Sequence, residues 1–293
     1  MAADVIAPLP RTDLYRQLLV LATVLAIGVV GLGAYVRLTD AGLGCPDWPG
    51  CYGHMLVPDS AADSGRAWRE MIHRYAAGSL GLLILALTLA AWQRPQSRFA
   101  RPWLETGLCG IVVMQALLGM WTVTEMLKPV IVTAHLLGGM LTWTMLAVLC
   151  RREYANGNNG KWSGLGAVTA IAVLLQISLG GWVSSHYAGL ACPGFPSCHG
   201  SWWPDGTAAS IHWAHRLGAV AVLAIVGTYA FVLLRTPAQR SFGLAIAALL
   251  AIQLALGVSN ILLGLPLPVG VSHNIGAALL LATVAVSLTR KRT

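Results

Sequence analysis

Charged side chains are scarce in this sequence. Asp, Glu, Lys and Arg make up 10% of the 293 residues, whereas hydrophobic residues make up 56%. Because a soluble domain carries about 25% charged residues, most of this chain is expected to face a solvent other than water. The composition therefore excludes an ordinary soluble protein and indicates one that is embedded in a lipid bilayer.

Carboxylates are the rarest charged groups, with 11 Asp and Glu against 19 Lys and Arg. A di-iron site in a helix bundle needs about four carboxylates. Besides Glu70, the only glutamates are Glu105, Glu125 and Glu153, and none of these three lies deep in an apolar run. The shortage of acidic residues therefore disfavours a di-iron carboxylate centre.

Long apolar runs predict an all-α integral membrane protein with eight transmembrane helices. Several runs reach the ~20 residues that cross a bilayer as a helix, and all are too continuous for the alternating strands of a membrane barrel. The runs are Leu18–Ala34, Ser79–Trp92, Leu108–Val123, Ile131–Cys150, Leu165–Val183, Leu217–Leu234, Leu244–Leu263 and Val269–Leu288.

The basic residues predict the orientation of these spans. With eight spans both termini lie on one face, and that face carries most of the Lys and Arg residues, among them Arg16, Arg94, Arg151, Arg235 and Arg240. By the positive-inside rule we expect both termini in the cytoplasm and the protein in a bacterial inner membrane. Because the basic residues are spread over short segments, the net charge of +8 indicates orientation and disfavours a nucleic-acid partner.

The sequence also repeats itself. Residues 41–53 (AGLGCPDWPGCYG) match residues 188–200 (AGLACPGFPSCHG) at eight of thirteen positions, and shorter matches around histidines follow in the same order. Such self-similarity indicates a tandem duplication. We therefore expect two parallel four-helix units, residues 1–150 and 162–293, joined by a cytoplasmic linker at residues 151–161 that is rich in Asn and Gly.

Four histidines form two repeat-related pairs, His73 with His135 and His215 with His273. Each lies near the outer end of an even-numbered span, so the members of a pair are expected at one depth. Ionisable residues inside spans mark functional sites, and two imidazoles facing across a bundle can hold a heme iron. Room for the flat macrocycle is expected from the nearby glycines Gly78, Gly138, Gly139, Gly218 and Gly276.

The two units differ beside the first histidine of each pair. Glu70 precedes His73 by three residues, whereas His212 precedes His215 by three, and this spacing places both members on one helix face. We hypothesise that the N-terminal unit does the chemistry, with Glu70 as an acid–base or charge-steering group, and that the C-terminal unit holds a resident heme. His212 has no assigned role, since a zinc ion there would lack further ligands.

Arginines and cysteines flank the predicted heme sites. Arg74 and Arg216 each follow a histidine, and they are predicted to pair with heme propionates, with interfacial snorkelling as the alternative. Prolines restrict the chain between the two cysteines of each outer loop, which favours a disulfide that pins the loop over the heme pocket. A redox-active thiol pair is the alternative. The predicted disulfides are Cys45–Cys51 and Cys192–Cys198.

Taken together, these motifs resemble the heme A synthase family over nearly the whole chain. The cysteine pair in both outer loops is typical of one variant of that family. The resemblance rests on residues 33–51 (GAYVRLTDAGLGCPDWPGC), on Glu70-Met-Ile-His-Arg74, on His135, on His215-Arg216 and on His273.

The resemblance implies that heme O is oxidised at a ring methyl to the formyl group of heme A. It implies that His73 and His135, with Glu70 nearby, form the substrate site, and that His215 and His273 bind heme b. Heme O synthase would act upstream and heme–copper oxidases would receive the product. The electron donor is not identified by the resemblance.

Other functions fit parts of the pattern. A di-heme electron-transfer protein needs the same four histidines but not Glu70, and it would leave its hemes unaltered. A thiol–disulfide oxidoreductase would use the loop cysteines and would survive loss of the histidines. A transporter is disfavoured, because the polar residues gather at the outer end of the spans and not at the midplane.

Overall fold

A computed structural model describes residues 11–94, 102–154, 163–198 and 200–289. Over these residues it contains eight long helices, all apolar enough to cross a membrane, which confirms the predicted all-α integral membrane fold. The helices are α1 (Arg11–Leu38), α2 (Ser64–Gln93), α3 (Trp103–Thr124), α4 (Pro129–Tyr154), α5 (Gly164–Ser185), α6 (Thr207–Leu234), α7 (Arg240–Leu262) and α8 (Leu267–Ser287), with a 3-10 turn at Pro237–Gln239.

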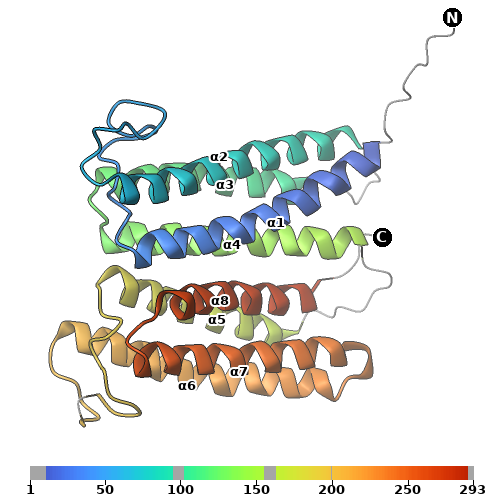
Figure 1. The fold of residues 1–293 in the computed structure, drawn as a ribbon. Coiled ribbons are helices and arrows are strands. Elements are labelled where there is room, and N and C mark those ends of the chain that lie inside the picture. Colours follow the sequence, from blue (N-terminus) through green and yellow to red (C-terminus); the bar gives the residue numbers. More distant parts are fainter. Residues whose placement is uncertain (1–10, 95–101, 155–162, 199, 290–293) are drawn as a thin grey trace, which may run out of the picture.

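The helices pack as two groups of four (Figure 1). In the first group α1 and α3 each contact both α2 and α4, and in the second α5 and α7 each contact both α6 and α8. Between the groups, α8 lies against α1 and α4, and α4 also lies against α5. The core contains buried side chains from both groups, including Ile84, Leu146, Val226 and Leu281.

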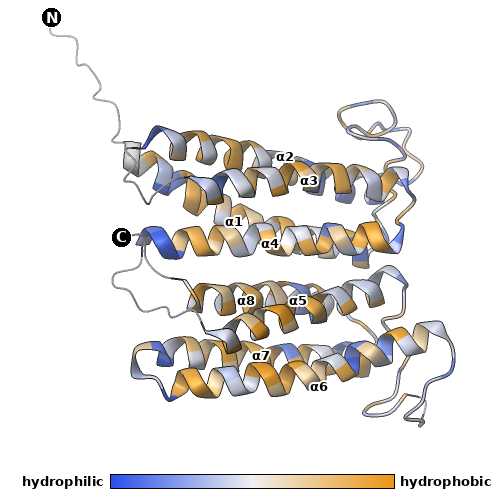
Figure 2. Ribbon diagram, turned by 180° about the vertical axis from the view of Figure 1, so that it is seen from behind, coloured by the Kyte–Doolittle hydropathy of each residue, from blue (hydrophilic) through white to orange (hydrophobic). Residues whose placement is uncertain are grey.

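The side chains that face outward are those expected against lipid. Leu82, Val24 and Leu175 are each more than half exposed, and Figure 2 shows hydrophobic residues along the whole length of the helices. A helix whose outer face is as apolar as its inner face is stable in a bilayer but not in water. Helix α4 continues to Tyr154, so the predicted linker at 151–161 begins within this helix, and its residues 155–161 lie outside the described residues.

The two ends of the molecule differ in kind. Helix α1 begins and helix α8 ends at one end, where a short connection with the 3-10 turn Pro237–Gln239 also joins α6 to α7 (Figure 1). The opposite end, called the loop end below, carries two long connections, residues 39–63 (the first loop) and residues 186–206 (the second loop). These loops contain the repeated cysteine motif.

Candidate functional site

The four predicted histidines lie on the four even-numbered helices, in the half of each helix nearer the loop end. His73 is on α2 and His135 on α4, while His215 is on α6 and His273 on α8. His73 lies within electrostatic range of His135, and His215 lies within that of His273. The structure therefore brings the predicted members of each pair close together.

Each of the four imidazoles packs against a glycine of the preceding helix. A Cβ atom added to this glycine would lie 3.1 to 3.3 Å from the imidazole Cε1 atom, which is closer than ordinary van der Waals contact. Glycine thus lets each ring rest on the neighbouring backbone. The four pairs are Gly33–His73, Gly119–His135, Gly180–His215 and Gly257–His273.

Three glycines that were expected to make room for a macrocycle instead face glutamine side chains. A Cβ atom on any of them would lie 1.8 to 2.2 Å from a glutamine amide atom, so that space is filled. The facing pairs are Gly138–Gln115, Gly218–Gln176 and Gly276–Gln253. At the other two glycines there is more room. A Cβ atom added to Gly139 would lie 3.9 Å from Oε1 of Gln115, and one added to Gly78 would meet no described neighbour outside its own helix backbone within 4 Å.

The chemistry of each histidine pair fits a heme. Each pair supplies two imidazoles, which is an axial ligand set that leaves the equatorial positions to a macrocycle. Among the described residues, Nδ1 of His73, His135 and His273 is buried without a hydrogen-bond partner. Buried polar atoms of this kind are costly in an apolar environment, and unpaired ones in a native structure mark positions with a functional role.

Glu70 connects helix α2 to the first loop. Its side chain is buried, with an exposed fraction of 4%. One carboxylate oxygen accepts a hydrogen bond from Arg74 Nη2 at 2.5 Å, and the other accepts one from the backbone N–H of Cys45 at 2.9 Å. Since Glu70 precedes His73 by three residues, it joins the loop to the part of α2 that carries the histidine.

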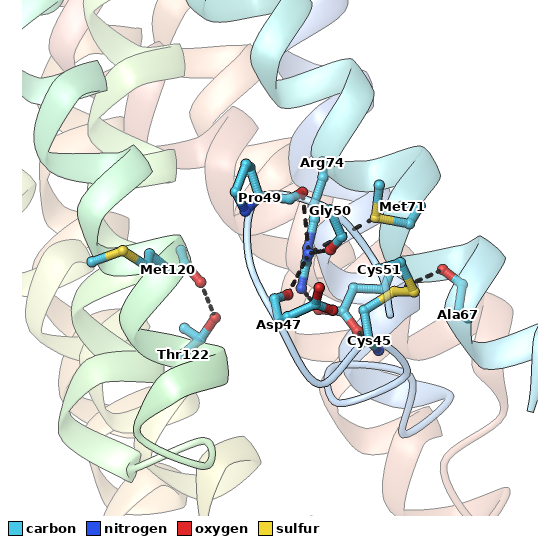
Figure 3. A network of polar contacts seen from close by, with 12 residues as sticks. Cys45, Asp47, Pro49, Gly50, Cys51, Ala67, Met71, Arg74, Met120 and Thr122 are labelled. Atoms are coloured by element: carbon cyan, nitrogen blue, oxygen red, sulfur yellow. Dashed lines mark hydrogen bonds and ion pairs between the residues drawn. A yellow bond between two sulfur atoms is a disulfide. The ribbon is translucent and has the colours of Figure 1, made fainter. Parts of the chain in front are cut away.

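Arg74 and Arg216 bind the loops through backbone carbonyl groups. Nη1 of Arg74 donates to the carbonyls of Asp47 at 2.9 Å and Gly50 at 2.6 Å, as Figure 3 shows. Nη1 of Arg216 donates to the carbonyl of Gly194 at 2.7 Å in the second loop. Each guanidinium group therefore has partners within the protein, and pairing with heme propionates stays a prediction.

The loops are attached differently in the two halves. In the first loop the carboxylate of Glu70 accepts from the backbone of Cys45. In the second loop Arg216 Nη2 donates directly to the carbonyl of Cys192. His212 stands three residues before His215, as Glu70 does before His73; it is buried and faces the backbone of Ala188. Sequence reasoning found the Glu70–His212 difference but not these attachments.

Both predicted disulfides are present, Cys45–Cys51 and Cys192–Cys198. All four cysteines are at most 1% exposed, and each loop contains a cis proline bond, at Pro49 or Pro196. Thiol–disulfide exchange requires access of an attacking thiolate to the sulfur. The burial therefore favours a structural role over the redox-active alternative.

The carboxylate of Asp47 makes acid-sensitive contacts in the first loop, and the second loop carries no carboxylate at the corresponding position, Gly194. The backbone N–H groups of Gly53 and Tyr52 each donate to its carboxylate at 2.7 Å, and these bonds, first of all that from Gly53, lower the pKa of Asp47 below 3.8. Since the folded-state pKa lies below the unfolded one, the stabilisation is present at neutral pH and is lost as pH falls through the folded pKa.

We therefore expect hydrogen exchange of residues 45–53 to quicken as pH falls below 3.8, after correction for the intrinsic rate. The second loop is the internal control, because Gly194 stands at the position that corresponds to Asp47. In Asp47→Asn the pH dependence should disappear. The same acid transition in this variant would show that another group is responsible.

Comparison with known proteins places the chain in a family. Residues 16–285 match the model of the cytochrome oxidase assembly protein family, COX15-CtaA. A heme A synthase of Shewanella oneidensis is 38% identical over 91% of this chain and 93% of its own length. Heme A synthases of Rhizorhabdus wittichii (25% identical; 95% of this chain, 94% of the relative) and Shouchella clausii (27%; 83% and 85%) are also similar. With nearly its whole length matched, the chain belongs to the COX15-CtaA family of cytochrome oxidase assembly proteins.

Proposed function

We propose that this protein is a heme A synthase, an enzyme that oxidises a ring methyl of heme O to the formyl group of heme A. The observation that carries the proposal is the presence of two histidine pairs, each packed on glycines at the loop end, in a chain whose relatives are named heme A synthases. Heme O synthase would supply the substrate, heme–copper oxidases would receive the product, and a donor of unknown identity would supply electrons.

The two groups of helices have different roles in this proposal. In residues 1–150, His73 and His135 hold heme O as the substrate, and Glu70 holds or moves a proton beside it. In residues 162–293, His215 and His273 hold heme b, which when bound supplies electron transfer. The asymmetry supports this assignment, because a buried carboxylate stands beside the first histidine in the N-terminal group only.

The arrangement of the helices supports the proposed duplication and orientation. The ring of contacts among α1–α4 recurs among α5–α8, and the glycine–histidine contacts recur with it. The loop end holds the two disulfides, which persist in an oxidising compartment. We therefore place the loop end on the outer face of a bacterial inner membrane, with both termini in the cytoplasm and lipid around the helices.

Heme analysis of whole cells tests the function. We expect heme A, or its hydroxymethyl precursor, when this protein is produced together with a heme O synthase in a host that lacks heme A. His73→Ala should abolish the conversion, because it removes a ligand of the substrate site. His54→Ala is the matched control, since His54 is an exposed loop residue. Bound heme b with unchanged heme O under aerobic conditions would favour the di-heme electron-transfer alternative.

A further inference from the structure

Beside three of the four histidines, the preceding helix carries a glutamine. The glutamine lies four residues before the glycine that touches the histidine, and its amide covers a second glycine, three residues after that histidine. The glutamine amide can occupy this place only if the second residue is glycine, because a Cβ atom there would lie within 2.2 Å of the amide. The glutamines are Gln115 for His135, Gln176 for His215 and Gln253 for His273.

Gln176 makes the most direct contact. Its Nε2 donates to the backbone carbonyl of His215 at 2.9 Å and lies 3.1 Å from the Nδ1 atom of the same residue. Its Oε1 is buried and has no hydrogen-bond partner among the described residues. An imidazole that binds iron through Nε2 carries its proton on Nδ1. If the Gln176 amide turns so that Oε1 replaces Nε2, this oxygen can accept a hydrogen bond from the Nδ1–H group.

The other two glutamines lie at the equivalent positions of α3 and α7. The amide of Gln115 packs at Gly138 and that of Gln253 at Gly276, each about one helical turn beyond the histidine. Partners of this kind fix the orientation of a ligating ring, and their loss typically costs about 10- to 100-fold in metal affinity. Among the described residues Gln176 makes this bond to the ring of His215, whereas Gln115 and Gln253 confine the helix turn that follows His135 and His273 by packing against its glycine.

His73 is the exception. Val29 stands four residues before Gly33, where the other helices carry glutamine, and a valine side chain cannot form a hydrogen bond. Ala76 stands three residues after His73, where the other helices carry glycine, and its methyl group takes the space that an amide would need. Both halves of the glutamine–glycine unit are thus missing at this one histidine.

We propose that His73 is the exchangeable axial ligand, and that Gln115, Gln176 and Gln253 are positioning residues that retain the other three. The inference rests on the proposed function, in which a substrate must enter and a product must leave the N-terminal site while the second heme stays. A pocket with one firmly held ligand and one loosely held ligand meets the first requirement. A pocket with two firmly held ligands meets the second.

Heme release from the purified full-length protein tests this inference. Transfer of heme from the detergent-solubilised protein to excess apomyoglobin, followed by absorbance, should show a fast phase from the N-terminal site and a slow phase from the C-terminal site. Val29→Gln combined with Ala76→Gly should slow the fast phase about tenfold. Ala76→Gly alone is the matched control, because it makes room without adding an amide, and it should leave the fast phase unchanged.

The reciprocal variant is Gln176→Val, which should speed the slow phase about tenfold. It should also shift the electron paramagnetic resonance spectrum of the oxidised C-terminal heme, because that signal depends on imidazole orientation. If the double variant does not fold, this single variant decides the question by both measurements.

The inference would be overturned if the two sites released heme at equal rates. It would also be overturned if these substitutions changed neither the release rates nor the spectra. A protein that shows the expected release rates but leaves heme O unaltered would overturn the proposed function and keep the difference between the ligands. A protein that binds no heme would overturn both.

Discussion

Replacing Glu70 with alanine is expected to weaken the attachment of the first loop to helix α2, where Arg74 would keep its contacts with the carbonyls of Asp47 and Gly50. The substitution leaves the Arg74 side chain, only 12% exposed, without its carboxylate partner, and it leaves the backbone N–H of Cys45 unpaired. Removal of one member of a buried ion pair costs about 3–5 kcal/mol. We expect a correspondingly lower thermal stability in detergent, a Cys45–Cys51 disulfide that becomes reducible without denaturant, and loss of heme O conversion.

The matched control is His212→Ala, because His212 occupies the corresponding position in the C-terminal half. Arg216 binds the second loop through carbonyl groups without help from residue 212, so the Cys192–Cys198 disulfide should stay protected. Glu70→Gln separates two roles, since glutamine still accepts from Cys45 but carries no charge. Full turnover together with a protected disulfide in Glu70→Ala would contradict both the catalytic and the structural role of Glu70.

The second large effect is expected from Gly44→Ala. A Cβ atom at this position would lie 2.5 Å from the backbone carbon of Arg66 and 2.7 Å from the backbone nitrogen of Ala67. These obstacles are backbone atoms at the beginning of α2, which cannot turn aside as a side chain can. The loop must therefore move, and overpacking of this kind costs about 1–3 kcal/mol.

Thermal unfolding in detergent and alkylation of released thiols measure this displacement. The control is provided by the repeat, because Ala191 stands in the second loop where Gly44 stands in the first. That site already holds a methyl group, so Ala191→Gly should change stability by no more than about 1 kcal/mol. Equal losses in the two variants would show that the close approach at Gly44 does not determine the position of the first loop.

Hydropathy and repetition made much of this architecture predictable. A helix that crosses a bilayer requires an uninterrupted apolar run, so the span at Leu108–Val123 appears as helix Trp103–Thr124 with only its ends extended. The disulfides were predictable because two cysteines with prolines between them occur twice, in equivalent segments. In these cases a local pattern of residues determines the structure, and no knowledge of distant contacts is needed.

The partners of Arg74 could not be predicted in the same way. An arginine after a histidine can snorkel, bind a propionate or bind loop carbonyls. Because every residue has a backbone carbonyl group, the sequence does not show which carbonyls an arginine will bind. The glycine–histidine contacts are an intermediate case. The spacing Gln-x-x-x-Gly occurs at residues 115–119, 176–180 and 253–257. Its meaning depends on which helix faces which histidine, and this became apparent only from the packing.

The contacts between the two groups of helices have the pattern of a symmetric homodimer. Exchanging α1 with α5 and α4 with α8 turns the α1–α8 contact into the α5–α4 contact and maps the α4–α8 contact onto itself. Two identical subunits would pack in this isologous way, but they would have to use the same side chains at both sites. Once the subunits share one polypeptide, equivalent positions can carry different residues. Position 70 can be glutamate while position 212 is histidine, and position 29 can be valine while position 176 is glutamine. Under the proposed function, fusion of two gene copies allows one ancestral pocket to become two, one that retains its heme and one that releases it.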